Sequence, residues 1–243
     1  MKLRKVHLLW LAAAALALGG YAGCSPRVTK YALKKVYLVS SQVYYVPAGQ
    51  FKTVDFAPPP APESEAQKQD LANTLAWQDK RTGADCAKAR LTAEADYDFF
   101  WADKSPFPSP LPDEVKGFFS RLDSDLGDAV DNMKKRYQRL RPYKAYPGRA
   151  IPCIKKSMGY SYPSGHSSYS RVFADVLADI VPARKDEFLK KADEIAVDRV
   201  IGGVHFQTDI AAGKVFGDLY HSELRKSEAY LKDIEKMKAL LVD

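Results

Sequence analysis

Two histidines, a carboxylate and several basic residues occur in three short segments whose residue types could act on a phosphate group. The segments are Lys134 with Arg141-Pro142, then Pro163-Ser164-Gly165-His166, then Arg199 with His205 and Asp209. Together they can supply a cationic pocket for an oxyanion, a proton donor and an oriented imidazole nucleophile. The sequence therefore predicts phosphoryl transfer that needs no metal and no cofactor.

The first segment offers two cations for phosphate oxygens. Lys134 and Arg141 are seven residues apart, two helical turns, so we expect both on one helix face. A solvated helix face is the alternative for any single basic residue, and Lys135, Arg136 and Arg139 are expected to meet solvent. Arg141 differs because the following proline biases it away from helical geometry, which favours a guanidinium fixed at a helix end.

The second segment resembles the start of a helix. Ser164 is a favourable N-cap, and Gly165 allows the backbone to approach a ligand closely. The free amides of such a helix start can bind an oxyanion, and His166 at its rim can protonate a departing oxygen. An ordinary capped helix with an exposed histidine is the alternative.

The third segment pairs an imidazole with a carboxylate. His205 and Asp209 are four residues apart, so Asp209 can orient the ring if a helix starts there. Gly202-Gly203 should break the preceding helix and let Arg199 converge with His205. A helix-start pair without a catalytic role is the alternative, and His221 is expected to be structural.

The elements that must position these residues are helical. Apolar spacing, including Ala66, Leu71, Ala72 and Leu75, and proline stops predict helices over residues 64–82, 84–102, 113–122, 125–140, 166–180, 184–200 and one or two over 207–241. Proline-rich loops separate them near 106–112 and within 143–163. We expect a single all-α domain from residue 60 to residue 243.

The N-terminus has the pattern of an export signal. Residues 1–23 carry a basic start and a short apolar run, and residues 24–59 are expected to form an extended arm or tether. The end of the signal resembles a bacterial lipoprotein signal, which would place a lipid on Cys24; secretion without lipid and a short N-terminal anchor helix are the alternatives. The expected location is periplasmic or secreted, with a membrane tether only through that lipid.

Charge and cysteine content narrow the function classes. The 243-residue chain has a formal charge of +7, or +4 without the three basic residues of the signal, and lacks the dense basic face of a nucleic-acid-binding protein. Phosphorylated small molecules are the expected partners. Cys86 and Cys153 can form a disulfide in an oxidising compartment, or remain two buried thiols.

The three segments together resemble the phosphatidic-acid-phosphatase type 2 superfamily, and within it the secreted bacterial class A non-specific acid phosphatases. The family motif reads K-x6-R-P, P-S-G-H and S-R-x5-H-x3-D, although Asp198 replaces its last serine and Ser167 replaces a usual threonine. The resemblance implies a compact helical domain of the acid phosphatase–vanadium haloperoxidase type, and self-association is frequent among relatives. It also implies roles: His205 attacks phosphorus, Asp209 orients it, His166 serves as acid and base, and the oxygens are held by Lys134, Arg141, Ser164, Gly165 and Arg199.

Other activities fit parts of the pattern. A lipid phosphate or pyrophosphate phosphatase and a vanadium haloperoxidase resemble the same motif set. A non-catalytic envelope lipoprotein that binds phosphate or a partner protein is the alternative outside enzymology. A zinc site formed by His166, His205 and Asp209 is disfavoured because their spacing is not that of metal ligands.

Overall fold

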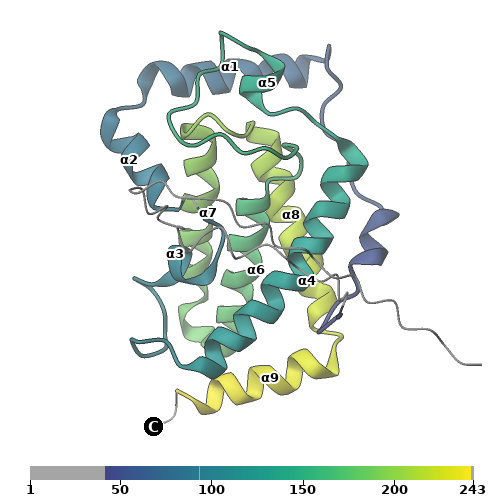
Figure 1. The fold of residues 1–243 in the computed structure, drawn as a ribbon, viewed down its shortest axis with the longest axis vertical. Helices are drawn as coiled ribbons and strands as arrows, with labels where there is room; N and C mark the ends of the chain where they lie inside the picture. Colours follow the sequence, from purple (N-terminus) through teal and green to yellow (C-terminus); the bar gives the residue numbers. More distant parts are fainter. Residues whose placement is uncertain (1–41, 93, 242–243) are drawn as a thin grey trace, which may run out of the picture. The chain divides into compact units, whose positions relative to one another are not determined.

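The computed structural model describes residues 42–92 and 94–241. The expected signal segment, Cys24 and the first half of the expected arm lie outside these residues. All regular elements within them are helices, as the sequence predicts. They are η1 (Ala48–Lys52), α1 (Glu65–Lys80), α2 (Gly83–Leu91), α3 (Tyr97–Trp101), α4 (Asp113–Tyr137), α5 (Pro142–Ala145), α6 (Gly165–Ile180), η2 (Pro182–Arg184), α7 (Lys185–Ile201), α8 (Gln207–Leu224) and α9 (Glu228–Ala239) (Figure 1).

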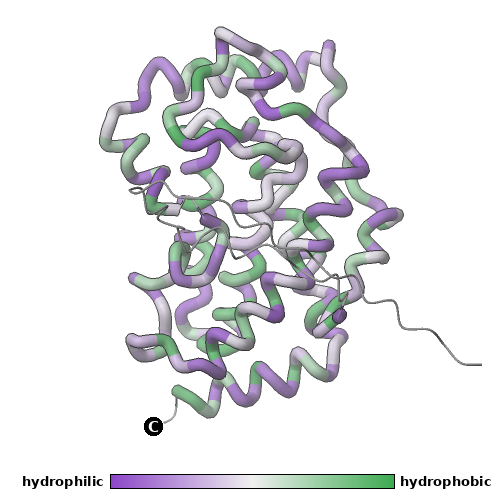
Figure 2. The backbone as a smooth tube through the Cα atoms, viewed as in Figure 1, coloured by the Kyte–Doolittle hydropathy of each residue, from purple (hydrophilic) through white to green (hydrophobic). Residues whose placement is uncertain are grey.

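Helix α6 lies at the centre of the fold. Figure 1 shows it beside α7 and α8, with α4 crossing in front, α1 lying across one end and α9 across the other. Its apolar side chains Val172, Phe173, Val176 and Leu177 are fully buried. Hydrophilic residues recur along the outer helices α1 and α9 (Figure 2), and α9 turns Tyr230, Ile234 and Met237 inward at helical spacing. The core therefore encloses α6, whose N-terminus carries the second segment.

Helices α6 and α8 approach each other closely because α8 has glycines at their contact. A Cβ on Gly213 would lie 2.6 Å from the Ser167 Cβ and 2.7 Å from the Ser164 carbonyl oxygen. A Cβ on Gly217 would lie 2.7 Å from the Arg171 Cβ. This close packing fixes the N-terminus of α6 against the N-terminal half of α8.

Helix α4 is one continuous helix of 25 residues, so the expected break between Leu122 and Asp125 is wrong. Asp125 is buried on the inner face, where its carboxylate accepts hydrogen bonds from the backbone N–H groups of Tyr44, Tyr45 and Val46 at 2.7–3.1 Å. This polar residue inside the helix thus has its partners in another segment.

The described part of the expected arm packs on the helices. Tyr45, Val46, Phe51 and Phe56 are buried in the main core. Residues 42–59 therefore belong with the helical domain, which extends further toward the N-terminus than the predicted boundary at residue 60.

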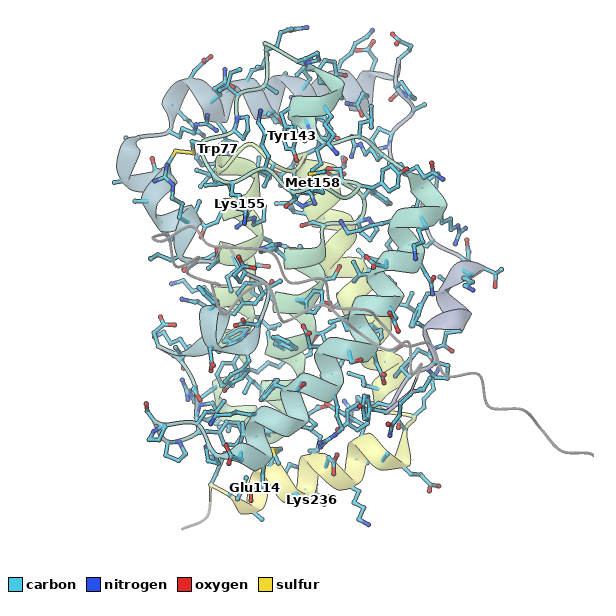
Figure 3. The ribbon with its side chains drawn as sticks, viewed as in Figure 1. Trp77, Glu114, Tyr143, Lys155, Met158 and Lys236 are labelled. Carbon is cyan, nitrogen blue, oxygen red and sulfur yellow. A yellow bond between two sulfur atoms is a disulfide. The ribbon has the colours of Figure 1, made fainter. Side chains whose placement is uncertain are left out.

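The expected helix over residues 84–102 is divided into α2 and α3. Thr82 caps α2 with a reciprocal Asp85 capping box, and Asp96 caps α3 separately. A disulfide joins Cys86 in α2 to Cys153, the bonded alternative of the two that the sequence left open (Figure 3). The loop before the second segment is thereby tied to α2.

Helix α1 buries polar side chains where the sequence predicted an apolar face. Ala66 and Ala72 are exposed, whereas Gln67, Asp70 and Thr74 are buried. Among residues 42–92 and 94–241, no helix is both long enough and apolar enough to cross a lipid bilayer. The polar face of α1 points to the candidate site described next.

Candidate active site

The three segments meet where α4 ends and α6 and α8 begin. The Ser164 N–H donates to the Asp209 carbonyl oxygen at 3.0 Å, which joins the second segment to the third. Arg141 Nη1 lies 3.0 Å from His205 Nε2, which joins the first to the third. A Cβ on Gly165 would lie 3.8 Å from Lys134 Cε, which brings the first beside the second. Residues far apart in the sequence thus form one site.

Lys134 and Arg141 reach this site from different elements. Helix α4 ends at Tyr137 because Gln138 adopts a left-handed conformation with φ of 48°, so the expectation of one continuous helix face through Arg141 is wrong. Arg141 is extended at the N-cap of α5, as the following Pro142 predicts. The two cations lie close together because the chain turns at Gln138, and not because they share one helix face.

A loop before α6 lies against these cations. Four consecutive carbonyl oxygens, those of residues 157–160, accept hydrogen bonds from Tyr143, Lys144, Arg141 and Lys134 in that order. The Lys134 bond is 2.7 Å and the Arg141 bond, from Nε, is 2.9 Å. The Met158 side chain in this loop is 90% exposed (Figure 3). The loop therefore fixes the basic side chains through backbone groups alone.

The start of α6 has the predicted geometry. Ser164 is its N-cap, with an extended backbone and a side chain that accepts from the Ser167 N–H at 3.4 Å. Gly165 and His166 are the first residues of the helix. The His166 ring is half-buried, 5.8 Å from the ring of Phe100. The start of a helix favours a bound oxyanion because the positive end of the helix dipole lies there.

His205 is fully buried between a carboxylate and a guanidinium. Its Nδ1 lies 3.4 Å from Asp209 Oδ2 and 3.3 Å from Ser161 Oγ, and its Nε2 faces Arg141. A proton on Nδ1 facing Asp209 leaves the Nε2 lone pair directed toward the cationic side. Burial, followed by the positive charges of Arg141, Lys134, Arg199 and His166, lowers the pKa of His205 well below its usual value. The ring is therefore a neutral base in mild acid.

Arg199 lies in the last turn of α7, just before the Gly202-Gly203 turn, in which Gly203 has a φ of 76°, and its charge acts on His205. Its Nη1 donates to the carbonyl oxygens of Thr92 at 3.0 Å and Ala89 at 3.3 Å. Within the described residues its buried Nε has no hydrogen-bond partner. Asp198, at the family's serine position, is buried and lines a small hollow with Lys88 and Lys191.

The site holds more positive charge than its carboxylate balances. Burial, and then Arg141, lower the pKa of Lys134 to about 7. Burial, and then Arg141, lower the pKa of Arg199 to about 10. Both shifts express the cost of gathering cations in a poorly hydrated place, a cost that an anion would relieve. Over residues 42–92 and 94–241, no three His, Cys, Asp or Glu side chains are grouped as metal ligands.

Arg139 is the residue that sequence reasoning misplaced. It was expected on a solvated face, yet it is only 8% exposed and its Nη1 donates to Asp209 Oδ1 at 2.6 Å. Its Nη2 donates to Asp70 at 2.7 Å and Gln67 at 2.6 Å, both on α1. The signal in the sequence was the polar stripe Gln67, Asp70 and Thr74 at helical spacing. Lys135 and Arg136 are exposed, as expected.

His221 lies in another part of the fold. Its Nε2 is 2.8 Å from Asp179 Oδ2, which also accepts from the Tyr230 hydroxyl. The histidine thus joins α8 to α6 and α9, in line with the structural role expected for it.

Comparisons with known proteins find relatives among phosphatases. A family model described as PAP2 superfamily matches residues 126–224. A non-specific acid phosphatase from Providencia stuartii is 31% identical over 131 residues, covering 51% of this chain and 52% of that protein. One from Salmonella typhi is 33% identical over 118 residues and 47% of each chain. The chain therefore spans about half the length of the curated relatives it matches.

A solved structure supports the fold. The crystal structure of a bacterial vanadium-dependent iodoperoxidase superposes with a TM-score of 0.54 at 18% identity, over 74% of this chain and 53% of that one. The helical domain thus has the acid phosphatase–vanadium haloperoxidase type of fold, as the motif resemblance implied.

Proposed function

We propose that this protein is a metal-independent phosphomonoester hydrolase, an acid phosphatase that works through a phosphohistidine, and that the match of residues 126–224 to the PAP2 superfamily model reflects membership of that family. Its substrates are phosphorylated small molecules. The relatives that support the proposal are named non-specific acid phosphatases.

One observation carries the proposal: a buried imidazole has Asp209 at its Nδ1, while its Nε2 faces the buried guanidinium of Arg141. Arg141 Nη1 is 3.0 Å from His205 Nε2, and Arg199 Nε is a buried donor without an acceptor among the described residues. A phosphoryl group at this position gives each cation an oxygen and gives the imidazole an electrophile. A site built only to bind phosphate does not need a carboxylate-oriented histidine.

The proposed reaction has two steps. His205 Nε2 attacks phosphorus, the bond to the ester oxygen breaks, and His166 gives its proton to that oxygen. Asp209 stabilises the positive charge that develops on the His205 ring. Water then attacks the phosphohistidine, His166 takes a proton from that water, and His205 leaves as the neutral ring.

The phosphoryl oxygens are held throughout by charge and by backbone. Lys134, Arg141 and Arg199 supply cations, while Ser164 and the Gly165 amide supply neutral donors from the start of α6.

We also propose a location in the cell envelope. The Cys86–Cys153 disulfide supports an oxidising compartment, and the matched relatives are bacterial acid phosphatases. A lipid on Cys24 would add a membrane tether, and metabolic labelling with a fatty-acid analogue in wild type and Cys24→Ser tests it.

The direct test is turnover of p-nitrophenyl phosphate with and without a chelator, followed by trapping of the enzyme-bound phosphate. We expect activity that survives chelation and an acid-labile phosphate on His205 that His205→Ala abolishes. His221→Ala, which removes a half-buried histidine outside the site, is the matched control and keeps the label. Label on Ser164, or loss of activity with chelator, overturns the mechanism.

His166 has its own test. In His166→Ala the loss of rate should be large for alkyl phosphates, which need leaving-group protonation, and small for dinitrophenyl phosphate, which does not. An equal loss for both substrates would contradict the acid role.

A further inference from the structure

Asp209, the carboxylate beside His205, accepts hydrogen bonds from several other groups at both of its oxygens. Asp209 is fully buried, and Oδ2, which faces His205, also accepts from the Phe206 N–H at 2.8 Å and from the Ser161 hydroxyl. Its other oxygen, Oδ1, accepts from Arg139 Nη1 at 2.6 Å. Each oxygen therefore has a defined set of donors, and rotation of the carboxylate would break all of them.

Arg139 joins this carboxylate to a second one. Its Nη2 donates to Asp70 Oδ2 at 2.7 Å, and both members of this pair are buried. Asp70 also accepts from the N–H and the hydroxyl of Thr208, the neighbour of Asp209 in α8. Arg139 Nη1 donates to the same Thr208 hydroxyl at 2.7 Å. Helix α1 is thus linked to the first turn of α8 by charge-assisted bonds.

The charges of this group complement those of the phosphate site. Two carboxylates share one guanidinium, so Asp70, Arg139 and Asp209 together carry one net negative charge behind His205. When His205 is phosphorylated at Nε2 its ring becomes cationic, and this negative charge lies on the Nδ1 side of the ring. In the part of the chain that the structure describes, the Arg139 guanidinium donates to Thr208, Asp209, Gln67 and Asp70 and to none of the groups proposed to hold the phosphoryl oxygens, so its effect passes through Asp209.

We propose that Arg139 and Asp70 are positioning residues for catalysis, which fix Asp209 so that it stabilises the charge on His205 in the transition state. The inference rests on the proposed phosphatase function and extends its machinery to α1. It predicts that loss of either residue lowers kcat and leaves KM nearly unchanged, because substrate binding depends on the other side of His205.

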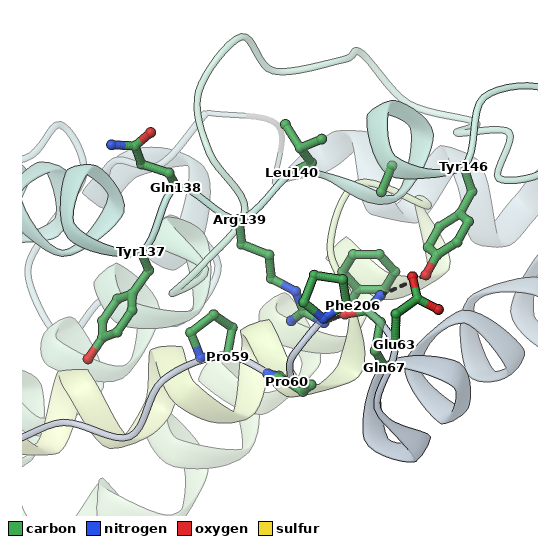
Figure 4. Close-up of a pocket in the computed structure, with 12 residues that line it drawn as sticks. Pro59, Pro60, Glu63, Gln67, Tyr137, Gln138, Arg139, Leu140, Tyr146 and Phe206 are labelled. Carbon is green, nitrogen blue, oxygen red and sulfur yellow. Dashed lines mark hydrogen bonds between the residues drawn. The ribbon is translucent and has the colours of Figure 1, made fainter.

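The structure also offers a route for chemical rescue. Arg139 lines a pocket of about 440 Å³ together with Pro59, Pro60, Tyr146 and Phe206 (Figure 4). The guanidinium lies over the Phe206 ring, 4.3 Å from its centre. In Arg139→Ala the space of the side chain would open into this pocket, so that free guanidinium ion can enter and bridge the two carboxylates. A lost packing contact could not be restored in this way.

The experiment compares wild type with Arg139→Ala, Asp70→Asn, the double variant and Arg136→Ala, using p-nitrophenyl phosphate with millimolar guanidinium or with sodium at equal ionic strength. We expect kcat to fall roughly 10- to 100-fold in Arg139→Ala with KM within about threefold. Guanidinium should restore part of that loss. Asp70→Asn should lower kcat less, and the double variant should be no slower than Arg139→Ala because the two residues act as a unit.

Arg136→Ala is the matched control. Arg136 is exposed at the same end of α4 and donates to the Val54 carbonyl oxygen, so its removal should change neither kcat nor the response to guanidinium. If Arg139→Ala does not fold, the nearly isosteric Asp70→Asn decides alone, with circular dichroism and thermal melting as checks. Unchanged kcat in the folded variants, or a loss confined to KM, overturns the proposal. Failure of wild type to turn over substrate would instead reject the proposed function.

Discussion

The shifted pKa of Lys134 predicts how oxyanion affinity depends on pH. Its pKa is lowered to about 7 by burial and by the charge of Arg141. Below that pH Lys134 is protonated and ready to pair with an anion. Above it, Lys134 is neutral, and anion binding must draw a proton from solvent because the bound anion favours the charged form. Affinity should therefore weaken as the pH rises through 7.

The size of the effect follows from the linkage of one proton. Between pH 5 and 7 the dissociation constant should rise only about twofold, and between pH 7 and 9 roughly 50-fold, approaching tenfold per pH unit. Sulfate is the suitable probe because it remains a dianion over this whole range, whereas phosphate changes its own charge. Isothermal titration calorimetry in two buffers of different ionisation enthalpy measures both the affinity and the proton uptake.

Lys134→Arg is the matched variant, since its guanidinium stays charged throughout the range. Its absolute affinity can differ from wild type, but the rise above pH 7 should disappear. A flat profile in wild type would refute the reasoning. So would a rise of the same size in Lys134→Arg, because another group would then be responsible.

Three further measurements test the packing, the disulfide and the base. Gly213→Ala would set a Cβ 2.7 Å from the Ser164 carbonyl oxygen, so it should lower the free energy of unfolding in urea by about 1–3 kcal/mol and should also lower kcat. Gly117→Ala on α4 is the control, because its Cβ would meet only the flexible end of the Arg121 side chain at 3.4 Å. That variant should have an unchanged free energy of unfolding or one raised by up to about 1 kcal/mol. The Cys86–Cys153 bond closes a loop of 67 residues, so Cys86→Ser should cost about 4 kcal/mol in the same assay, and unchanged stability would contradict the loop-entropy estimate. Because the pKa of His205 is lowered, kcat/KM should peak in mild acid, where the nucleophile is neutral and the general acid protonated; a flat rate from about pH 5 to 9 would rule out that pairing.

The candidate site residues could be predicted from the sequence because each lies in a short segment whose backbone conformation is set by neighbouring residues. Pro142 fixes the backbone of Arg141, Ser164 caps a helix, and Gly203 turns the chain before His205. These effects depend only on residues adjacent in the sequence, and the structure has each of them. The convergence of Lys134 and Arg141 could not be predicted from their spacing. The seven-residue spacing indicated one shared helix face, whereas the helix ends at Tyr137 and the left-handed backbone of Gln138 turns the chain.

Hydrogen-bond partners that come from distant segments could not be predicted from the hydrophobic periodicity of the sequence. The sequence predicted a helix break before Asp125, whereas this residue lies inside α4 and its partners, the amides of residues 44–46, come from the expected arm. Arg139 resembled a surface residue because its acceptors Asp70 and Gln67 lie on α1. A single sequence tells that a residue is polar, but not whether a complementary group will be folded against it.

The link between Arg139 and α1 bears on how the proposed active site could be transplanted or the chain shortened. The stretch that matches the family model starts at residue 126, whereas Asp70 and Gln67 lie well before it. A graft of residues 126–224 onto a foreign scaffold would carry every residue proposed to bind the phosphate. It would leave Arg139 paired with Asp209 alone, because Asp70 lies outside that range. A minimal transplantable module should therefore include residues 64–82, or else a substitute acid engineered to meet Arg139.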